Sequence, residues 1–147
     1  METKIFDLKE LNKHNLEQSL VYDNAEANEI VDKALGKIDE AAQIILDGGL
    51  VAFPTETVYG LGANALDPEA VAKIFSAKGR PSDNPLIVHI ARASNIGELT
   101  PVLTPEIVRI IDNFWPGPLT IVLPKKASVP DITTGGLNTV AIRMPDK

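Results

Sequence analysis

The stretch LVAFPTETVYGLGANALDPEAVAKIFSAKGRPSDNPLIVHI, residues 50–90, contains most of the features that decide the fold. It begins and ends with short apolar runs, residues 50–53 and 86–90, whose length is typical of buried strands. Between them lies a segment rich in Pro, Thr, Gly and Asn, which predicts an irregular loop. Two strand ends and a threonine-rich loop are therefore expected to meet the basic pair Lys78 and Arg80, as in a site for a small anion.

A helix is predicted between the loop and this basic pair. Asp67 is a suitable N-cap, and Pro68 fits the first helical position, where its missing N–H costs no hydrogen bond. An apolar face at helical spacing follows, formed by Val71, Ile74 and Phe75. We expect this helix to end at the basic pair.

Outside this stretch, the sequence predicts further strands and helices in alternation. Before it we expect a strand at 3–8, an irregular loop at 9–28 and an amphipathic helix at 28–47 that breaks at Gly36. After it we expect a helix capped by Ser94, a helix starting at Thr104, a turn at 115–118, a strand at 119–123, a flexible loop at 128–138 and a strand at 140–143. The helix after Thr104 is expected to bury Ile107, Ile110, Ile111 and Phe114. The order is typical of an α/β fold.

Composition and charge limit the classes of function. Among the 147 residues, 44% are apolar and none is Cys, which suits one domain with a core and no disulfide framework. Residues 1–50 carry 11 acidic and 5 basic side chains, whereas residues 51–147 carry 9 of each. This balance disfavours a broad nucleic-acid surface but permits a local cationic pocket. Without a leader pattern or a long apolar run, we expect a soluble cytoplasmic protein with no membrane segment.

Several ordered motifs resemble the YrdC-type threonylcarbamoyl-AMP synthase family. They are PTETVYGLG at 54–62, KGRP and NPL within 78–86, the His of LIVHI, WPGPLT at 115–120, and the Arg that ends the strand TVAIR at 139–143. Each motif is weak alone, but together they match over residues 35–147. The resemblance implies a YrdC-like mixed twisted sheet with flanking helices, incomplete at its C-terminus. We expect a single domain over 1–147, with an acidic lead-in at 1–34 and the family-like core at 35–147.

The same resemblance implies an enzyme, an L-threonylcarbamoyladenylate synthase. Such an enzyme condenses L-threonine, bicarbonate and ATP, with Mg²⁺ on the triphosphate, and releases pyrophosphate. Its product serves threonylcarbamoyladenosine formation in tRNA, so the implied partners are these small molecules and tRNA-modification proteins. The family's domain continues into a Ser-x-Asn segment that touches the nucleotide. Because this chain lacks that segment, we expect it to bind ligands weakly and to be a poor catalyst or none.

The candidate site residues combine charges with hydroxyl and amide groups. Lys78 offers a point charge and Arg80 a planar fork for phosphate, and Gly79 between them can let both point inward. By resemblance, the catalytic residues are Lys78 and Arg80, the ATP-binding residues are Lys78, Arg80, Asn84 and Thr139, and the L-threonine-binding residues are Thr57, His89 and Arg143. With two His and no Cys, we propose no protein-held metal site.

Each of these residues also has an ordinary structural interpretation. The basic pair could be a solvated turn after a helix, and a single His on a strand is more often structural than functional. Arg143 could form a surface salt bridge, although Thr139, four residues earlier on the same strand, faces the same side. Tyr59 could either line the pocket or belong to the core.

Two other functions stay open from the sequence. A related domain could bind a nucleotide or double-stranded RNA without catalysis, although the acidic balance counts against a broad RNA surface. Threonine-dependent ATP/pyrophosphate exchange would distinguish the enzyme from this module. A carbamoyl-handling part of a hydrogenase-maturation-type protein would require pairs of cysteines, and this sequence has none.

Overall fold

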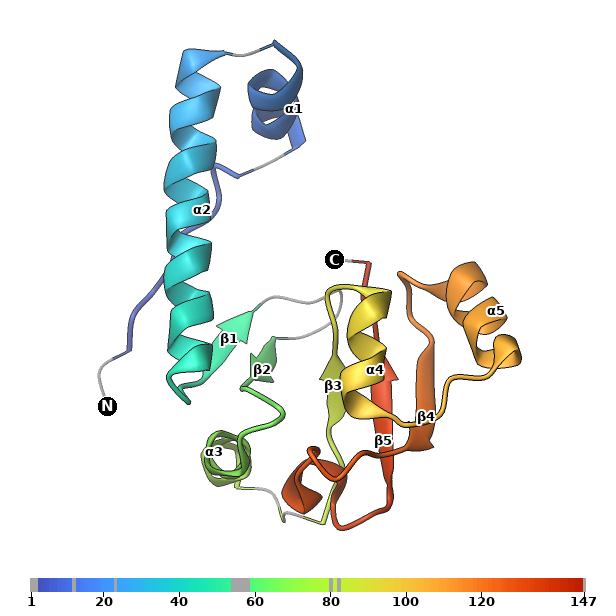
Figure 1. Ribbon diagram of the computed structural model, residues 1–147. Helices are drawn as coiled ribbons and strands as arrows, with labels where there is room; N and C mark the ends of the chain where they lie inside the picture. The colour runs from blue at the N-terminus through green and yellow to red at the C-terminus, as the bar shows by residue number, and fades with distance from the viewer. Residues whose placement is uncertain are drawn as a thin grey trace. The chain divides into compact units, whose positions relative to one another are not determined.

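The computed structural model describes residues 3–11, 13–22, 24–53, 59–79, 81 and 83–146. The chain divides into two compact units, Met1–Asp47 and Gly48–Lys147, each with its own internal packing (Figure 1). Unit 1 is a pair of helices, α1 (Lys13–Tyr22) and α2 (Ala25–Leu46). The side chain of Asn24 caps α2 by accepting a hydrogen bond from Ala27 N, which satisfies one of the free N–H groups at the helix start.

The N-terminal segment of unit 1 contradicts the predicted strand at residues 3–8. This segment has no strand partner and follows α2 through a Lys4–Glu40 ion pair and a hydrogen bond from Lys37 Nζ to Asp7 O. Ile5, one of the apolar residues that suggested a strand, is 88% exposed. An alternating pattern forms a strand only where a neighbouring strand can pair with it.

Two further predictions for unit 1 are wrong. Residues 13–22, predicted as part of a loop, form α1, because packing against α2 stabilises a helix whose own apolar pattern is weak. Three small or branched residues of α2 are buried, namely Ala27, Val31 and Ala34. Gly36 does not break α2, since one glycine costs a helix only about 1 kcal/mol.

Unit 2 is built around a three-stranded mixed sheet with the strand order β3-β5-β4. β3 (Ile87–His89) runs parallel to β5 (Thr139–Arg143), and β4 (Thr120–Pro124) runs antiparallel to β5. A separate antiparallel pair, β1 (Val51–Phe53) and β2 (Gly60–Gly62), precedes this sheet. The predicted α/β class and all four strands predicted in this part of the chain are confirmed.

The strand β2 lies in a stretch that the sequence predicts as a loop. Its Gly-Leu-Gly sequence has no strand-forming pattern, yet it pairs with β1 in the register Phe53↔Gly60 and Val51↔Gly62. A Cβ atom on Gly62 would lie 2.9 Å from Cε1 of Phe53, so glycine allows the Phe53 ring to approach this backbone. Backbone pairing and this close contact, rather than side-chain periodicity, make the segment a strand.

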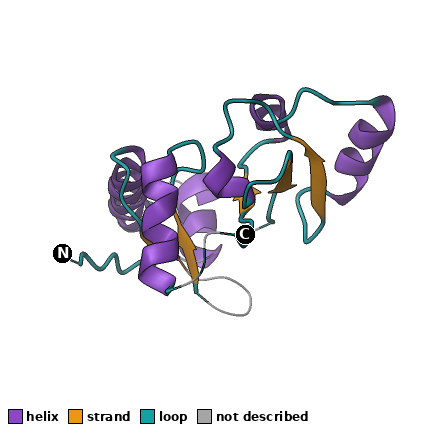
Figure 2. Ribbon diagram, turned by 90° about the horizontal axis from the view of Figure 1, so that it is seen from below, coloured by secondary structure: helices purple, strands orange, loops and turns teal. Residues whose placement is uncertain are grey.

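One face of the three-stranded sheet is buried and the other is open. The buried face carries Val88, Val140, Ile142 and Leu123, and it packs against Ile96 and Leu99 of α4 (Ile96–Leu99) and Ile111 of α5 (Pro105–Phe114). The open face carries residues that are half-buried or exposed, namely Ile87, His89, Thr120, Val122, Thr139, Ala141 and Arg143. Figure 2 shows α5 beyond β4 at the edge of the sheet. No helix among the described residues is long and apolar enough to cross a membrane.

In unit 2, the predicted N-caps of α3 and α5 are confirmed, whereas the predicted buried face of α5 is not. Asp67 caps α3 (Pro68–Lys78) as expected, and Thr104 caps α5. However, Ile110 is 43% and Phe114 60% exposed, because α5 sits at the sheet edge and reaches the core mainly through Ile111. A short η1 (Ala93–Asn95) contains Ser94, which therefore does not cap α4.

The predicted flexible loop at 128–138 instead contains three of the most buried residues of unit 2. It contains the helix η2 (Asp131–Thr134), and Val129, Thr133 and Thr134 are each at most 1% exposed. The polar and glycine-rich sequence suggested mobility, but the threonine hydroxyls are used for hydrogen bonds to the backbone. Hydroxyl groups that find backbone acceptors can be buried without penalty.

Candidate functional site

His89 and Arg143 are neighbours on the open face of the sheet. They are register partners on the parallel strands β3 and β5, so their side chains leave the same face about 4.8 Å apart. Ile90 N donates to Arg143 O at 3.0 Å, which continues the pairing beyond β3. The sheet therefore brings together two residues that are 54 positions apart in the sequence. We call this pair the Arg143 end of the open face.

Backbone contacts from the turn at residues 115–118 fix Arg143. Arg143 Nε donates to Gly117 O at 3.2 Å, and Gly117 N donates to Met144 O at 2.9 Å. The turn is anchored by Trp115, which is 7% exposed and donates from Nε1 to Leu119 O at 2.8 Å; its bond to Pro116 is cis. Among the described residues no carboxylate pairs with Arg143, which leaves the outer nitrogens of its guanidinium for a ligand.

The surroundings of His89 favour its neutral form. Burial against the sheet lowers its pKa below the ordinary value of 6.5, and the positive charge of Arg143 lowers it further. A neutral imidazole has one nitrogen that accepts hydrogen bonds. The Arg143 end thus combines a cation with a neutral acceptor, which suits a ligand bearing a carboxylate next to an amine.

Thr139 marks the opposite end of the same face. It lies four residues before Arg143 on β5, so the two side chains share a face about 13 Å apart along the strand. Thr139 pairs with Pro124 on β4, whereas Arg143 pairs with Thr120. The open face is therefore long enough to hold two ligands, or two parts of one, along β5.

Lys78 and Asn84 meet at a small cavity at the start of β3. The cavity has a volume of about 90 Å³ and is lined by Ile74, Phe75, Lys78, Asn84, Pro85 and Leu86. Because β3 and β5 are parallel, the start of β3 lies at the same end of the sheet as Thr139. Lys78 is the last residue of α3, and Gly79 follows it in a left-handed conformation with φ 59°. We call Lys78, Asn84 and Thr139 the Thr139 end.

The other predicted residues are not placed at either end of the open face. Thr57 and Arg80 lie outside the residues that the structure describes. Tyr59 is 77% exposed and so does not belong to the core. The described residues contain no group of three His, Asp or Glu side chains that could hold a metal ion.

The supports of the site were missed by sequence reasoning. Gly117 O accepts from Arg143, while Lys125 Nζ and Thr133 Oγ1 donate to the backbone carbonyls of Val129 and Ala65, and none of the three residues has a distinctive local pattern. The adjacent pair Thr133-Thr134 before two glycines was the one available signal, but it indicated a turn rather than a buried support.

Comparison with known proteins matches the part of the chain that carries this face. The model of the Sua5/YciO/YrdC family, described as "Telomere recombination", matches residues 43–147. The chain belongs to this family. Helix α1 and most of α2 lie before the matched region, whereas all of unit 2 lies inside it.

Curated members of the Sua5/YciO/YrdC family share much of this sequence. The chain is 61% identical over 109 residues to the threonylcarbamoyl-AMP synthase of Pyrococcus abyssi, a match that covers 74% of this chain and 32% of that protein. It is 54% identical over 111 residues to the Bacillus subtilis threonylcarbamoyl-AMP synthase, covering 75% and 32%. The chain thus spans about a third of the length of these two relatives.

A solved structure agrees with the fold. The crystal structure of P. abyssi Sua5 complexed with L-threonine superposes with a TM-score of 0.73 at 59% identity. The superposition covers 76% of this chain and 33% of that one. The mixed sheet and its flanking helices are therefore those of the Sua5/YciO/YrdC fold.

Proposed function

We propose that this chain contributes to a threonylcarbamoyl-AMP synthase, with L-threonine at the Arg143 end and ATP at the Thr139 end. The observation that carries this proposal is the pairing of His89 with Arg143 on the same open face as Thr139. The synthases of P. abyssi and B. subtilis support the reaction, and the L-threonine complex of P. abyssi Sua5 supports the amino-acid substrate.

The Arg143 end has the chemistry that an amino acid requires. The guanidinium of Arg143 is planar, permanently charged and held through Nε, so its remaining donors can take a carboxylate in two parallel hydrogen bonds. The amine of an amino acid lies next to its carboxylate. Neutral His89, beside Arg143, can accept a hydrogen bond from that amine without adding a repelling charge. Thr57 stays a predicted third contact to threonine.

The Thr139 end suits a phosphate chain and its nucleotide. Lys78 supplies a mobile positive charge, while Asn84 and Thr139 supply an amide and a hydroxyl. Arg80 stays a predicted second cation and, with Lys78, a predicted catalytic residue. Mg²⁺ is expected to arrive on the triphosphate, as part of the MgATP substrate.

The proposed reaction needs positioning and charge stabilisation more than a nucleophilic side chain. The deprotonated threonine amine attacks the carbon of bicarbonate, and water leaves as the carbamate forms. A carbamate oxygen then attacks the α-phosphorus of ATP, and pyrophosphate leaves with the bond electrons. Cations at the Thr139 end stabilise the charge that develops on the phosphates. Separate binding sites for threonine and ATP along β5 would place the two reactants on the same face of the sheet.

The test is ATP/pyrophosphate exchange, measured with and without L-threonine and bicarbonate. We expect any exchange, which the sequence predicts to be weak in this chain, to require both additions, and we expect Arg143→Ala to abolish the exchange that threonine stimulates. Exchange that ignores threonine would contradict the proposal. Salt-sensitive retention of double-stranded RNA without any exchange would instead identify a binding module.

A further inference from the structure

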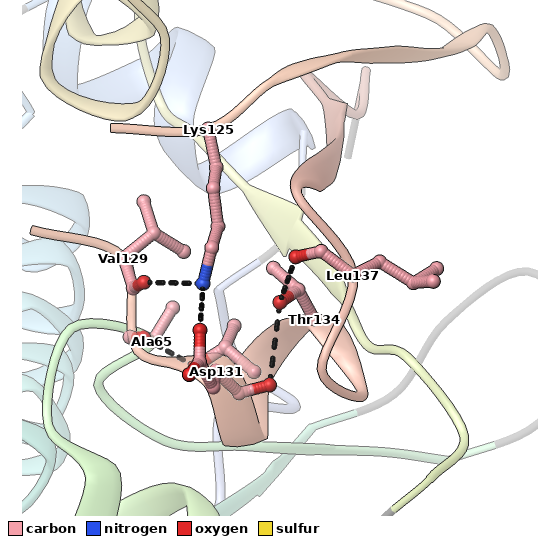
Figure 3. A network of polar contacts seen from close by, with 7 residues as sticks. Ala65, Lys125, Val129, Asp131, Thr134 and Leu137 are labelled. Atoms are coloured by element: carbon pink, nitrogen blue, oxygen red, sulfur yellow. Dashed lines mark hydrogen bonds and ion pairs between the residues drawn. The ribbon is translucent and has the colours of Figure 1, made fainter. Parts of the chain in front are cut away.

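A group of polar contacts surrounds η2, in a loop whose residues Val129, Thr133 and Thr134 are buried. We call it the η2 knot, formed by Lys125, Val129, Asp131, Thr133 and Thr134 (Figure 3). Lys125 Nζ donates to Val129 O at 3.0 Å and pairs with the carboxylate of Asp131. The Lys125 side chain is only 10% exposed, although lysine is rarely buried. Both of these contacts of its ammonium group are made to the loop at residues 128–138.

Thr133 joins two segments that are distant in the sequence. It is fully buried, and its Oγ1 donates to Ala65 O, 68 residues away, at 2.8 Å. Its own carbonyl accepts a hydrogen bond from Leu86 N at 3.0 Å. Ala65 belongs to the turn that leads into α3, and Leu86 leads into β3. One residue thus fixes the approach to α3, which ends at Lys78, and the approach to β3, which follows Asn84.

The end of η2 also touches the loop that contains Asn84. Gly135 ends η2 with φ 60°, and a Cβ atom there would lie 2.7 Å from Asp83 O and 3.2 Å from Pro85 N. Thr134 Oγ1 lies 2.8 Å from Leu137 O, and Lys125 N donates to Asn138 O at 3.0 Å, directly before Thr139. The knot therefore borders Asn84 on one side and Thr139 on the other.

From these contacts we propose that Thr133 and Lys125 are positioning residues for the nucleotide, because the η2 knot fixes the positions of Lys78, Asn84 and Thr139 relative to one another. The inference rests on the proposed function, which places ATP at the Thr139 end. The Arg143 end is held by other contacts, those from Gly117 to Arg143 and Met144. Loosening the knot should therefore weaken ATP binding and leave threonine binding nearly unchanged.

The test compares two valine substitutions at buried threonines. Thr133→Val removes the hydroxyl that reaches Ala65. Thr100→Val, at a residue 3% exposed, removes a hydroxyl whose partner within the described part of the chain is nearby Val102. MgATP and L-threonine are titrated separately into the intact chain by calorimetry. We expect Thr133→Val to weaken MgATP binding about tenfold, as loss of one well-placed contact does, and to change threonine binding less than about twofold. Thr100→Val should change neither.

A second variant and a second measurement keep the inference testable. Lys125→Met keeps the aliphatic stem but removes both contacts of Nζ, and it should give the same selective loss if Thr133→Val fails to fold. Equal loss of both ligands, or no loss of MgATP, would overturn the inference. Amide hydrogen exchange is measured as well, at Leu86 and at Gly117.

The exchange measurement separates this inference from the proposed function. If the unmodified chain binds neither MgATP nor threonine, the proposed function fails for this chain. The positioning role is then decided by exchange alone. Faster exchange at Leu86 with unchanged exchange at Gly117 in both variants would support it, and equal rates at Leu86 in variant and parent would overturn it.

Discussion

The two ends of the open face are held in different ways. Arg143 is fixed by a turn that is close in space and anchored by one large aromatic residue, Trp115. At the Thr139 end, the residues depend on the η2 knot, which joins segments from Ala65 to Asn138 through small polar contacts. If both ends bind ligands as proposed, this difference makes them two independently supported half-sites on one sheet, because each end has its own contacts to the backbone. The predictions below test that independence.

The largest expected effect is at the anchor of the turn. Trp115→Ala should lower the free energy of unfolding by about 3–5 kcal/mol, because a nearly buried indole leaves a cavity in the core. Trp115→Phe, which retains most of the apolar area but loses the bond to Leu119 O, should cost about 1 kcal/mol. Urea unfolding measures both. If the Ala variant still folds, exchange should rise at Gly117 and not at Leu86; equal rises at the two sites would break the comparison.

Arg143→Lys sharpens the comparison at the Arg143 end. Lysine lacks both the Nε contact to Gly117 O and the planar fork, so L-threonine affinity should fall by about 1.5–3 kcal/mol, tenfold or more. MgATP affinity should stay within about twofold. The control is Arg109→Lys, an exposed arginine whose ion pair with Glu106 lies on the surface. Calorimetric titration measures both affinities. Unchanged threonine affinity would show that Arg143 does not contact the ligand.

Lys78→Met is the matching change at the Thr139 end. The side chain is exposed and lines the small cavity, so its loss should leave the unfolding midpoint nearly unchanged. We expect MgATP to bind about tenfold more weakly and threonine to bind as before. Lys33→Met, in the exposed surface of α2, serves as the control. A loss of threonine affinity equal to that of MgATP would show that the two ends are not separate.

The smallest expected effect is a pH dependence of stability from His89. Because burial and Arg143 hold its pKa below 6.5, the folded chain binds a proton there less readily than the unfolded chain does. The contribution of His89 is therefore complete above pH 6.5 and is lost as the pH falls below that value. Urea unfolding at pH 7.5 and 5 should show a drop that is smaller in His89→Gln. An identical drop in the variant would mean that other groups cause it.

Sequence reasoning captured four strands of unit 2 and the helix caps Asp67 and Thr104, because their signals are local. Short apolar runs, a proline after Asp67 and after Thr104, and the stop at Trp115 each act within a few residues. The same reasoning misjudged α1, β2, η2 and the face of α5. Each of these depends on packing or pairing with another element, such as α2 for α1 and β1 for β2, which the residues of the element itself do not show.

The candidate site divides along the same line. From the sequence alone came the residue types and the common face of Thr139 and Arg143, since side chains four positions apart on a strand share a side. Only the tertiary structure decided that His89 lies beside Arg143, because strand register is not written in either strand alone. It also decided the contacts of Gly117, Lys125 and Thr133, because each of these contacts involves a backbone group that every residue possesses and that leaves no local pattern in the sequence.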